Sequence, residues 1–399
     1  MSIYSLYKLF IQHSEITTDS RKTPINSLFF ALKGENFDGN AYAEKALNAG
    51  SAYAIIDDPA YVKGERTILV DDVLTTMQKL AAHHRKVLGI PVIGITGSNG
   101  KTTTKELLAA VLSSKFNLLY TEGNLNNHIG VPLTLLRLNH DHEMAIIEMG
   151  ASHVGEIAEL CKIAQPDYGM ITNVGQSHLE GFGSFENVIQ AKGELYEYLR
   201  KANGTAFVDT DNDTLKTLSK GLKSISYGSS DDVFAYGELI EADPYMSFVW
   251  KQQGKLHTVN TQLVGGYNLK NALVAVAVGR FFKIPAERIS RIISGYVPTN
   301  NRSQLHKTAK NVLIIDTYNA NPSSMKVALE NFSAMKAPKK ALIIGGMKEL
   351  GKDSQALHEE ILKQIDHIKA DTVWLCGEPF AFAAKTHNWF EDVSTLRKH

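Results

Sequence analysis

Residues 94–106, with the sequence GITGSNGKTTTKE, constrain the fold more than any other part of the chain. The apolar run IPVIGIT leads into this segment, and the amphipathic run KTTTKELLAAVLSS follows its glycines. A buried strand, a glycine loop and a helix that opens on Lys-Thr together direct backbone N–H groups and a helix N-terminus at phosphate. The segment therefore predicts a nucleotide-binding strand–loop–helix unit in an α/β domain.

The loop departs from the usual phosphate-binding pattern, in which a glycine and four further residues precede Gly-Lys-Ser/Thr. Ile95 stands where the first glycine belongs, whereas Gly97 and Gly100 free the backbone close to the expected phosphate oxygens. We expect Lys101 to reach the β- and γ-phosphates and the hydroxyl of Thr102 to hold Mg²⁺. A plain glycine-rich turn is the alternative, and the flanking strand and helix argue against it.

Three zones divide the chain. Residues 1 to about 85 hold short strand-like runs (SLFFALKG, YAIIDD, TILVDD) around one helical stretch, YAEKALNAG. From PVIGITG to residue 298, apolar strands alternate with amphipathic helices, which predicts βαβ units on a mostly parallel sheet. Beyond Pro298 the pattern restarts with NVLIIDTYNANP, KALIIGGMKELG and DTVWLCGE, and it predicts a second, smaller α/β domain.

Two polar side chains follow predicted strands. Glu148 ends the run MAIIEMG, and the carboxyl end of a parallel strand lies beside the ligand crevice. Its carboxylate suits Mg²⁺, although an exposed strand-end glutamate is the alternative. His178 follows another strand and would face the same crevice, but a lone histidine is more often structural. The residues alone indicate an ATP- or GTP-using α/β enzyme, and a kinase, a ligase and a switch NTPase all remain open.

Charge and cysteine content narrow the partners and the compartment. Lys+Arg and Asp+Glu number 42 each, so no net positive field draws the chain to nucleic acid or an anionic membrane. The basic cluster HHRK at 83–86 is interpreted as a solvated helix end. Cys161 and Cys376 stand in no metal or disulfide spacing, which favours a reducing compartment.

The longest apolar run, 272–278, is too short to span a membrane, and the opening segment is interpreted as a short amphipathic element rather than a signal peptide. We expect a cytoplasmic protein.

The loop TGSNGKTTT resembles the Mur ligase family rather than standard phosphate-loop NTPases. Further segments carry the match: TEGNLNNHIGVPLTLLRL, IIEMGASHVGEI, SHLEGFGSFENVIQAKGELYEYL and DTYNANPSSM. Within the family, GNLNNHIGVP and YNANPSSM are typical of the branch that adds D-alanyl-D-alanine. The resemblance runs from TDSRKTPINSLFFALKGENFDG (18–39) to GGMKELGKDSQALH (345–358).

The resemblance implies three domains and one reaction. A small mixed α/β domain (1–85) would bind the uridine nucleotide, a central phosphate-loop ATPase domain with a mostly parallel sheet (86–298) would bind ATP, and a Rossmann-like C-terminal ligase domain (299–399) would close over both. ATP would phosphorylate the terminal carboxylate of UDP-N-acetylmuramoyl-tripeptide. The amine of D-alanyl-D-alanine would then attack the acyl phosphate, in a step of peptidoglycan precursor synthesis. We expect a monomer.

The resemblance also implies roles for individual residues. The predicted nucleotide-binding set is Gly97, Ser98, Asn99, Gly100, Lys101, Thr102, Thr103, Asn268, Asn271, Arg302 and Asp316. Asn268 and Asn271 match the pair that contacts adenine. Arg302 matches an arginine that reaches the phosphates from the third domain, and Asp316 matches the acid that binds ribose.

Two Mg²⁺ ions are implied as well. Thr102 and Glu148 would hold one, and His178 would help hold the other. The predicted catalytic set is Lys101, His178, Lys192 and Arg302, and the predicted metal set is Thr102, Glu148, His178 and Lys192. The substrate set is Ser20 and Arg21, which match the uridine-domain motif, and Asn127, which would contact the peptide.

Lys192 matches the lysine that Mur ligases carry as a carbamate. It lies in FENVIQAKGELYEYL, a predicted helix in which Val188, Leu195 and Leu199 form an apolar stripe. An ammonium beside two Mg²⁺ ions would be strongly repelled in a partly desolvated crevice. The same environment lowers the pKa of a lysine and leaves the neutral amine that captures CO₂. A solvated helix lysine is the alternative.

Two departures from the family pattern stand out. Tyr267 occupies a position where many relatives have histidine, so no role is assigned to it. The chain ends at STLRKH, where the family continues into a further strand with a Lys-Gly-Ser motif, so the third domain is expected to be truncated. A folylpolyglutamate synthetase-like amide ligase is one alternative, and the N-terminal DSRK…FDG module argues against it. A nucleotide-dependent switch or binding protein without ligase chemistry is the other.

Overall fold

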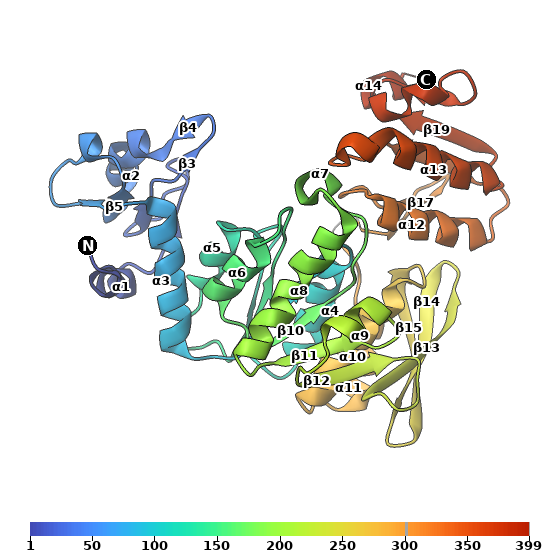
Figure 1. Cartoon of the computed structure of the whole chain (residues 1–399), viewed down its shortest axis with the longest axis horizontal. Coiled ribbons are helices and arrows are strands. Elements are labelled where there is room, and N and C mark those ends of the chain that lie inside the picture. The colour runs from blue at the N-terminus through green and yellow to red at the C-terminus, as the bar shows by residue number, and fades with distance from the viewer. Residues whose placement is uncertain (300–301, 399) are drawn as a thin grey trace.

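The computed structural model of the chain describes residues 1–299 and 302–398. Three α/β units follow one another, and Figure 1 shows them as an N-terminal unit in blue, a central unit, and a C-terminal unit in orange and red. Within the described residues, no helix is both long and apolar enough to cross a membrane.

The N-terminal unit is built on a four-stranded parallel sheet in the order β1-β2-β5-β6. Its strands are Ile16–Thr17, Leu28–Phe30, Tyr53–Ile56 and Thr67–Leu69. Alternate residues of β2 enter different cores, because successive side chains of a strand point to opposite faces. Leu28 and Phe30 pack with α1 (Ile3–Gln12) and α3 (Val73–Leu88), whereas Phe29 packs with α2 (Ala43–Ala49).

Smaller elements complete this unit. They are a hairpin of β3 (Lys33–Gly34) and β4 (Phe37–Asp38) and two 3₁₀ turns, η1 (Gly39–Tyr42) and η2 (Pro59–Tyr61). The opening segment is an amphipathic helix, since α1 buries Leu6, Tyr7 and Phe10.

Helix α3 joins the first two units, and it shows that the interpretation of HHRK as a solvated helix end is wrong. His84 and Arg85 are buried. The Nδ1 atom of His84 lies 3.2 Å from the hydroxyl of Tyr7, and its Nε2 atom lies 2.8 Å from the carbonyl of Leu138. Arg85 donates from Nη2 to Asp167 Oδ2 at 2.7 Å. Packing of α3 against the central unit buries these side chains, and the local sequence does not predict that contact.

The central unit contains a nine-stranded sheet in the order β15-β14-β13-β12-β11-β10-β7-β9-β8. The strands are β7 (Val92–Thr96), β8 (Leu118–Tyr120), β9 (Met144–Glu148), β10 (Tyr168–Ile171), β11 (Thr205–Asp209), β12 (Ser224–Gly228), β13 (Ala235–Ala242), β14 (Tyr245–Gln252) and β15 (Lys255–Val264). Neighbours from β8 across to β13 run parallel, which confirms the predicted mostly parallel sheet. The antiparallel meander of β13, β14 and β15 was not predicted.

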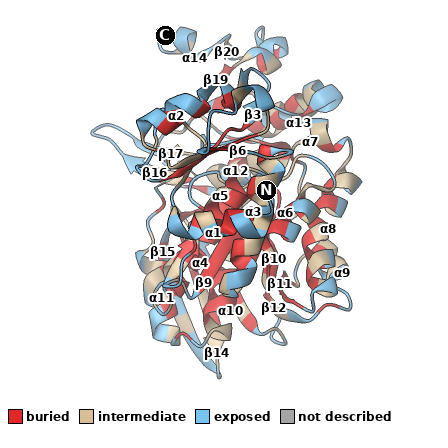
Figure 2. Ribbon diagram, turned by 90° about the vertical axis from the view of Figure 1, so that its left-hand side faces the viewer, coloured by how far each residue is buried: buried red, intermediate tan, exposed pale blue. Residues whose placement is uncertain are grey.

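Helices cover both faces of the central sheet. One face packs against α5 (Gly130–Leu135), α6 (Glu156–Ala164) and α8 (Phe185–Lys201). The other packs against α4 (Lys101–Leu112), α10 (Asn268–Phe281) and α11 (Ala286–Gly295). Two short helices, α7 (Leu179–Phe182) and α9 (Asp213–Leu218), flank α8. Figure 2 shows buried residues concentrated in the strands and in α4 and α10.

The C-terminal unit is the predicted second, smaller α/β domain. A parallel sheet of β18 (Ala341–Gly345), β19 (Thr372–Cys376) and β20 (Asn388–Phe390) forms its centre. An antiparallel pair, β16 (Gln304–Lys307) and β17 (Val312–Ile315), leads into it. The helices are α12 (Pro322–Ala334), η3 (Gly351–Asp353), α13 (Ser354–His367), η4 (Glu378–Ala383) and α14 (Val393–Leu396). This unit has its own apolar core.

Candidate active site

The glycine loop lies at the carboxyl end of β7 and opens helix α4. Ile95, which stands where a standard phosphate loop has glycine, is fully buried within β7, so the loop begins at Gly97. Gly97 has φ 144°, and a Cβ there would lie 2.0 Å from Thr172 Oγ1. Gly100 has φ 79°, and a Cβ there would lie 2.6 Å from Asn271 Oδ1. Only glycine fits both positions, which accounts for the shifted pattern.

The segment after β10 holds the backbone of this loop. The carbonyl of Asn99 accepts hydrogen bonds from Thr172 Oγ1 at 2.6 Å and from Asn173 Nδ2 at 3.0 Å. The amide N–H of Asn99 donates to Asn173 Oδ1 at 3.0 Å. Ser98 donates from Oγ to the carbonyl of Gly175 at 2.8 Å. The loop is therefore braced from one side before any ligand arrives.

Lys101 folds back over the loop. Its Nζ atom donates to the carbonyls of Gly97 at 2.7 Å and of Ser98 at 3.3 Å. Burial lowers the pKa of Lys101, the nearby charge of Arg302 lowers it further, and Glu148 opposes the shift. The ammonium thus lies at the mouth of the loop with neutral carbonyl partners, where an anionic phosphate would be a stronger one.

Glu148 has the features of a cation ligand. Its carboxylate is 1% exposed, and Oε1 accepts from Asn126 Nδ2 at 2.8 Å and from Thr102 Oγ1 at 3.4 Å. Its Oε2 atom is buried and has no hydrogen-bond partner among the described residues. A buried carboxylate oxygen without a donor is costly, and Mg²⁺ would satisfy it together with the Thr102 hydroxyl. Across residues 1–299 and 302–398, no group of three or more His, Cys, Asp and Glu could hold a metal. An ion here would need further oxygen ligands.

His178 lies between β10 and α7 and meets the C-terminal unit. Its Nδ1 atom contacts the carboxylate of Glu349. A carboxylate only accepts hydrogen bonds, so Nδ1 carries the proton and the neutral ring keeps a lone pair on Nε2. Burial lowers the pKa of His178, and the charges of Lys101 and Lys192 lower it further, against the opposing effect of Glu349. The lowered pKa favours the neutral ring, whose Nε2 can bind a metal.

Lys192 is 1% exposed, so the alternative of a solvated helix lysine is wrong. Its Nζ atom donates to the carbonyl of Ala151 at 3.2 Å and lies 5.0 Å from the centroid of the Phe182 ring. Burial, with a contribution from the charge of Lys101, lowers the pKa of Lys192 to about 7. Its helix buries the predicted apolar stripe of Val188, Leu195 and Leu199.

The two acids whose charge favours the Lys192 ammonium, Glu156 and Glu194, are engaged elsewhere. Both carboxylates accept hydrogen bonds from backbone N–H groups within residues 152–158, at distances of 2.6 to 3.1 Å. Lys192 is therefore a buried amine that faces a backbone carbonyl and an aromatic ring, and a substantial neutral fraction exists near pH 7.

Asn268 and Asn271 lie at the start of α10, against the glycine loop. Asn268 donates from Nδ2 to the carbonyl of Val264 at 2.8 Å. Asn271 donates from Nδ2 to Asn268 Oδ1 at 2.9 Å and accepts from Thr104 Oγ1 at 3.1 Å. These bonds tie α10 to α4. Contact of the two side chains with adenine stays a prediction.

Arg302 and Asp316 lie on the C-terminal unit. The guanidinium of Arg302 lies 3.9 Å from the centroid of the Tyr318 ring. Asp316 accepts from Ser303 Oγ at 3.0 Å, and the Ser303 hydroxyl also contacts that of Tyr267. Burial raises the pKa of Tyr267 to about 12. Tyr267, to which the sequence assigned no role, thus links the central unit to the C-terminal one.

The predicted substrate residues lie outside the glycine loop, in the N-terminal unit and before α5. Ser20 and Arg21 lie between β1 and β2 of the N-terminal unit. Arg21 is exposed and forms a two-pronged pair with Asp19, with both N···O distances at 2.9 Å, and this pair lowers the pKa of Asp19 to about 2. Asn127 accepts from the backbone N–H groups of Ile129 and Gly130 at 3.1 and 2.9 Å and so shapes the turn before α5.

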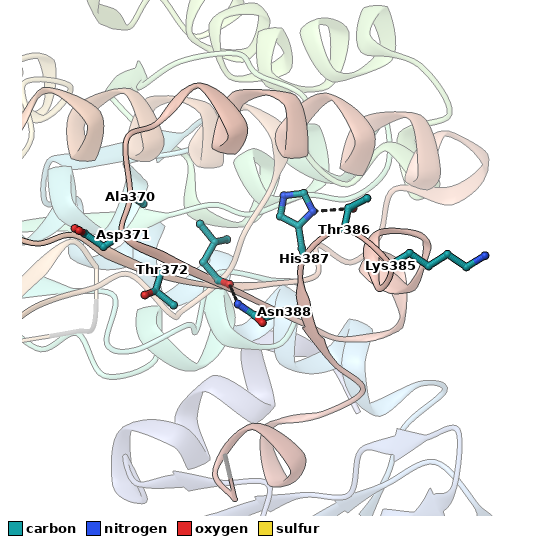
Figure 3. Close-up of a pocket in the computed structure, with 8 residues that line it drawn as sticks. Ala370, Asp371, Thr372, Lys385, Thr386, His387 and Asn388 are labelled. Atoms are coloured by element: carbon teal, nitrogen blue, oxygen red, sulfur yellow. Dashed lines mark hydrogen bonds between the residues drawn. The ribbon is translucent and has the colours of Figure 1, made fainter.

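A polar pocket of about 530 Å³ lies on the C-terminal unit, away from the loop (Figure 3). It is lined by Ala370, Asp371, Thr372, Val373, Lys385, Thr386, His387 and Asn388. These residues surround the amino ends of β19 and β20, whereas ligands of parallel sheets bind at the carboxyl ends. Both ring nitrogens of His387 already have partners, Thr386 and Asp366. The pocket is not part of the candidate active site.

Asn126, Asn321 and Glu349 are among the residues at the site that were not identified from the sequence. Each lies inside a segment that carries the family resemblance, so the signal was present but did not single them out. Asn321 precedes Pro-Ser-Ser, which predicts a helix cap and nothing more.

Comparisons with known proteins cover almost the whole chain. Family models match it for the Mur ligase family, catalytic domain, over residues 13–107, the Mur ligase middle domain over 95–279, and the Mur ligase, glutamate ligase domain over 301–397. A UDP-N-acetylmuramoyl-tripeptide--D-alanyl-D-alanine ligase of Bacillus subtilis (strain 168) is 37% identical over 374 residues. That match covers 93% of this chain and 81% of the relative.

Solved structures agree with these matches. A crystal structure of MurF from Acinetobacter baumannii is 30% identical with a TM-score of 0.86, and the match covers 94% of this chain and 83% of that one. MurF ligase from Thermotoga maritima, in complex with ADP, is 28% identical with a TM-score of 0.86, over 96% of this chain and 89% of that one.

Proposed function

The chain belongs to the Mur ligase family, and we propose that it joins D-alanyl-D-alanine to UDP-N-acetylmuramoyl-tripeptide at the expense of ATP, in peptidoglycan precursor synthesis. The activity in the names of its relatives supports this substrate pair, and the ADP complex of a neighbour supports the use of ATP. One observation of the structure carries the proposal. Lys101 of the central unit and Arg302 of the C-terminal unit bring positive charge to one glycine loop, beside the buried carboxylate of Glu148.

The first half of the reaction transfers the γ-phosphoryl group of ATP to the terminal carboxylate of the tripeptide, giving ADP and an acyl phosphate. Both reactants are anions, so the transfer requires fixed positive charge around them. Lys101 exchanges its carbonyl partners for phosphate oxygens and neutralises charge on the loop side. Arg302 leaves the ring of Tyr318 and approaches from the C-terminal unit.

The second half forms the amide. The neutral amine of D-alanyl-D-alanine attacks the acyl carbon, and the tetrahedral intermediate breaks its C–O bond to phosphate. The products are the peptide bond and inorganic phosphate, and the amine proton leaves to solvent or to the phosphate. The residues of the loop and the C-terminal unit keep water from the acyl phosphate, which would otherwise hydrolyse.

Magnesium is part of the proposal because the residues fit it. Thr102 and the buried Oε2 of Glu148 would hold one ion, and Nε2 of His178 with a carbamate on Lys192 would help hold a second. When bound, the ions would neutralise phosphate charge and polarise the transferred group.

The remaining assignments follow the three units. Residues 1–85, with Ser20 and Arg21, would bind the uridine nucleotide, residues 86–298 ATP, and residues 299–399 would close over both substrates. Asn268, Asn271 and Asp316 would contact the nucleoside, and Asn127 the peptide. We propose a monomer in the cytoplasm, where ATP is available and the two free, buried cysteines stay reduced.

The proposal is tested by measuring ADP release against a panel of UDP-muramoyl peptides. We expect release that requires both a UDP-muramoyl-tripeptide and D-alanyl-D-alanine, with a new peptide bond detected by mass spectrometry. ADP release that ignores D-alanyl-D-alanine would instead favour a nucleotide switch. Release with folate and glutamate would favour a folylpolyglutamate synthetase-like enzyme.

Replacing Arg302 by alanine should lower turnover by roughly 10²-fold, the scale for one preorganised charge. The Kd for the UDP-tripeptide should stay within about twofold of wild type, because the N-terminal unit supplies that affinity. Arg397→Ala, on the exposed end of the same unit, is the matched control and should behave as wild type. A large loss of UDP-tripeptide binding in Arg302→Ala would contradict this division of labour.

A further inference from the structure

A pair of side-chain amides joins the C-terminal unit to the glycine loop. Asn321 donates from Nδ2 to Asn99 Oδ1 at 2.7 Å, and Asn99 returns a weaker bond from Nδ2 to Asn321 Oδ1 at 3.4 Å. Asn99 belongs to the loop and Asn321 begins α12, and 222 positions of sequence separate them. Each amide donates once and accepts once, so replacing either side chain by an apolar one would break both bonds.

Neighbouring contacts hold α12 in this position. The backbone N–H of Gln176 donates to Ser323 Oγ at 2.8 Å. A Cβ on Gly175 would lie 2.7 Å from the same Ser323 oxygen, so a side chain at this position would displace Ser323. Gly175 and Gln176 follow the segment that braces the loop backbone. The first turn of α12 therefore contacts both the glycine loop and the segment after β10 that holds the loop backbone.

Residues of the central unit and of the C-terminal unit therefore both bind the loop. Its backbone at Asn99 is bound by Thr172 and Asn173 of the central unit, and its side chain is bound by Asn321 of the C-terminal unit. A shift of the loop by about an ångström would break the amide pair, because hydrogen bonds weaken steeply with distance and angle. Conversely, α12 forms all of its contacts with the central unit only when the loop conformation places the Asn99 side chain beside Asn321.

Resting on the proposed ligase function, we propose that Asn321 is a positioning residue for ligation. Through its hydrogen bonds to Asn99, it couples the conformation of the phosphate loop to the position of the C-terminal unit. Arg302 of that unit therefore reaches the phosphates only when the loop is correctly formed. Asn321 does not touch the reacting atoms in this role.

Asn321 also caps its own helix, and this second role can be separated from the first. Its Oδ1 atom accepts the backbone N–H of Ser324 at 2.9 Å, and its backbone N–H donates to Ser324 Oγ at 3.1 Å. Serine is an equally good N-cap but is too short to reach Asn99. Asn321→Ser therefore removes the pair between the units and keeps the helix cap. Ser324→Ala does the reverse, because it weakens the cap and leaves the amide pair.

The experiment is a double-mutant cycle on the full chain, with Asn321→Ser, Asn99→Ala and the double variant. We expect each single change to lower kcat by roughly tenfold, within the range of coupling between residues in contact, and the double variant to be no worse than either single variant. The Kd for ATP measured without UDP-tripeptide should stay within about twofold of wild type in Asn321→Ser, since the central unit supplies the loop. The Tm of Asn321→Ser should equal that of wild type, while Ser324→Ala should keep wild-type kcat.

Scattering gives a second readout that does not depend on activity. With ADP present, the radius of gyration from small-angle X-ray scattering should be larger in Asn321→Ser than in wild type, because the C-terminal unit seats less firmly. Wild-type kcat with an unchanged radius in Asn321→Ser, or additive losses in the cycle, would overturn the positioning role. Absence of ADP release by wild type with both substrates would count against the proposed function instead, and the scattering comparison would still decide the role of Asn321.

Discussion

Lys101→Ala should lower turnover by roughly 10²–10³-fold, the loss typical of removing one preorganised charge stabiliser. In the structure the ammonium donates to the carbonyls of Gly97 and Ser98 on the loop, and burial lowers its pKa. A phosphate group would restore a full ionic partner, so the stabilisation appears when negative charge builds up on the transferred group. The effect should fall on kcat, measured as ADP release at saturating substrates.

Binding of the UDP-tripeptide to Lys101→Ala should remain close to that of wild type, because the N-terminal unit supplies it. Lys115→Ala is the matched control, since Lys115 lies exposed just beyond the far end of α4 and contacts the carbonyl of Phe282. We expect that variant to keep wild-type turnover. If Lys101→Ala turned over near the wild-type rate, the loop would not be catalytic.

Local sequence signals were sufficient for the central framework of the site. The strand that ends at Glu148, the helix that starts at Lys101 and the glycines between β7 and α4 were all predicted in place, and the structure confirms these elements. Each depends on residues within a few positions of one another. Backbone geometry then explains the odd loop pattern, since the oxygen of Thr172 excludes any side chain at Gly97.

Features that depend on distant residues could not be predicted in this way. The burial of His84 and Arg85 depends on the central unit, and HHRK alone resembles an exposed helix end. The contacts of Asn321 with Asn99 and of Glu349 with His178 join units that are far apart in sequence. Such contacts leave no periodicity or spacing in the chain, so only the three-dimensional arrangement reveals them.

Lys192 shows how structure strengthens a hypothesis that the sequence resemblance raised. Two observations favour a carbamate on its amine. The side chain is buried against Phe182 and Ala151, and its pKa is lowered to about 7, so neutral amine is present at physiological pH. The acids Glu156 and Glu194 are bound to backbone N–H groups instead of to the amine. A carbamate would bring a negative charge beside Lys101 and relieve the repulsion between the two lysines.

Lys192→Ala should therefore lower turnover by roughly 10²-fold, as expected for the loss of one fixed charge near the reacting groups. Added formate or acetate should restore part of the lost activity, because a small carboxylate can replace the carbamate in the space that the side chain leaves. Lys201→Ala, an exposed change at the end of the same helix, should keep wild-type turnover and gain nothing from formate.

The carbamate itself is tested on wild type. After long depletion of CO₂, turnover should fall and should recover when bicarbonate is added. The recovery should weaken as the pH drops well below 7, because protonation of an amine with a pKa of about 7 removes the form that reacts with CO₂. Mass spectrometry under native conditions should show an added CO₂ that Lys192→Ala lacks. If wild type were indifferent to depletion, or Lys192→Ala turned over normally, Lys192 would act as a plain buried lysine and the anion near Lys101 would have to come from the substrate alone.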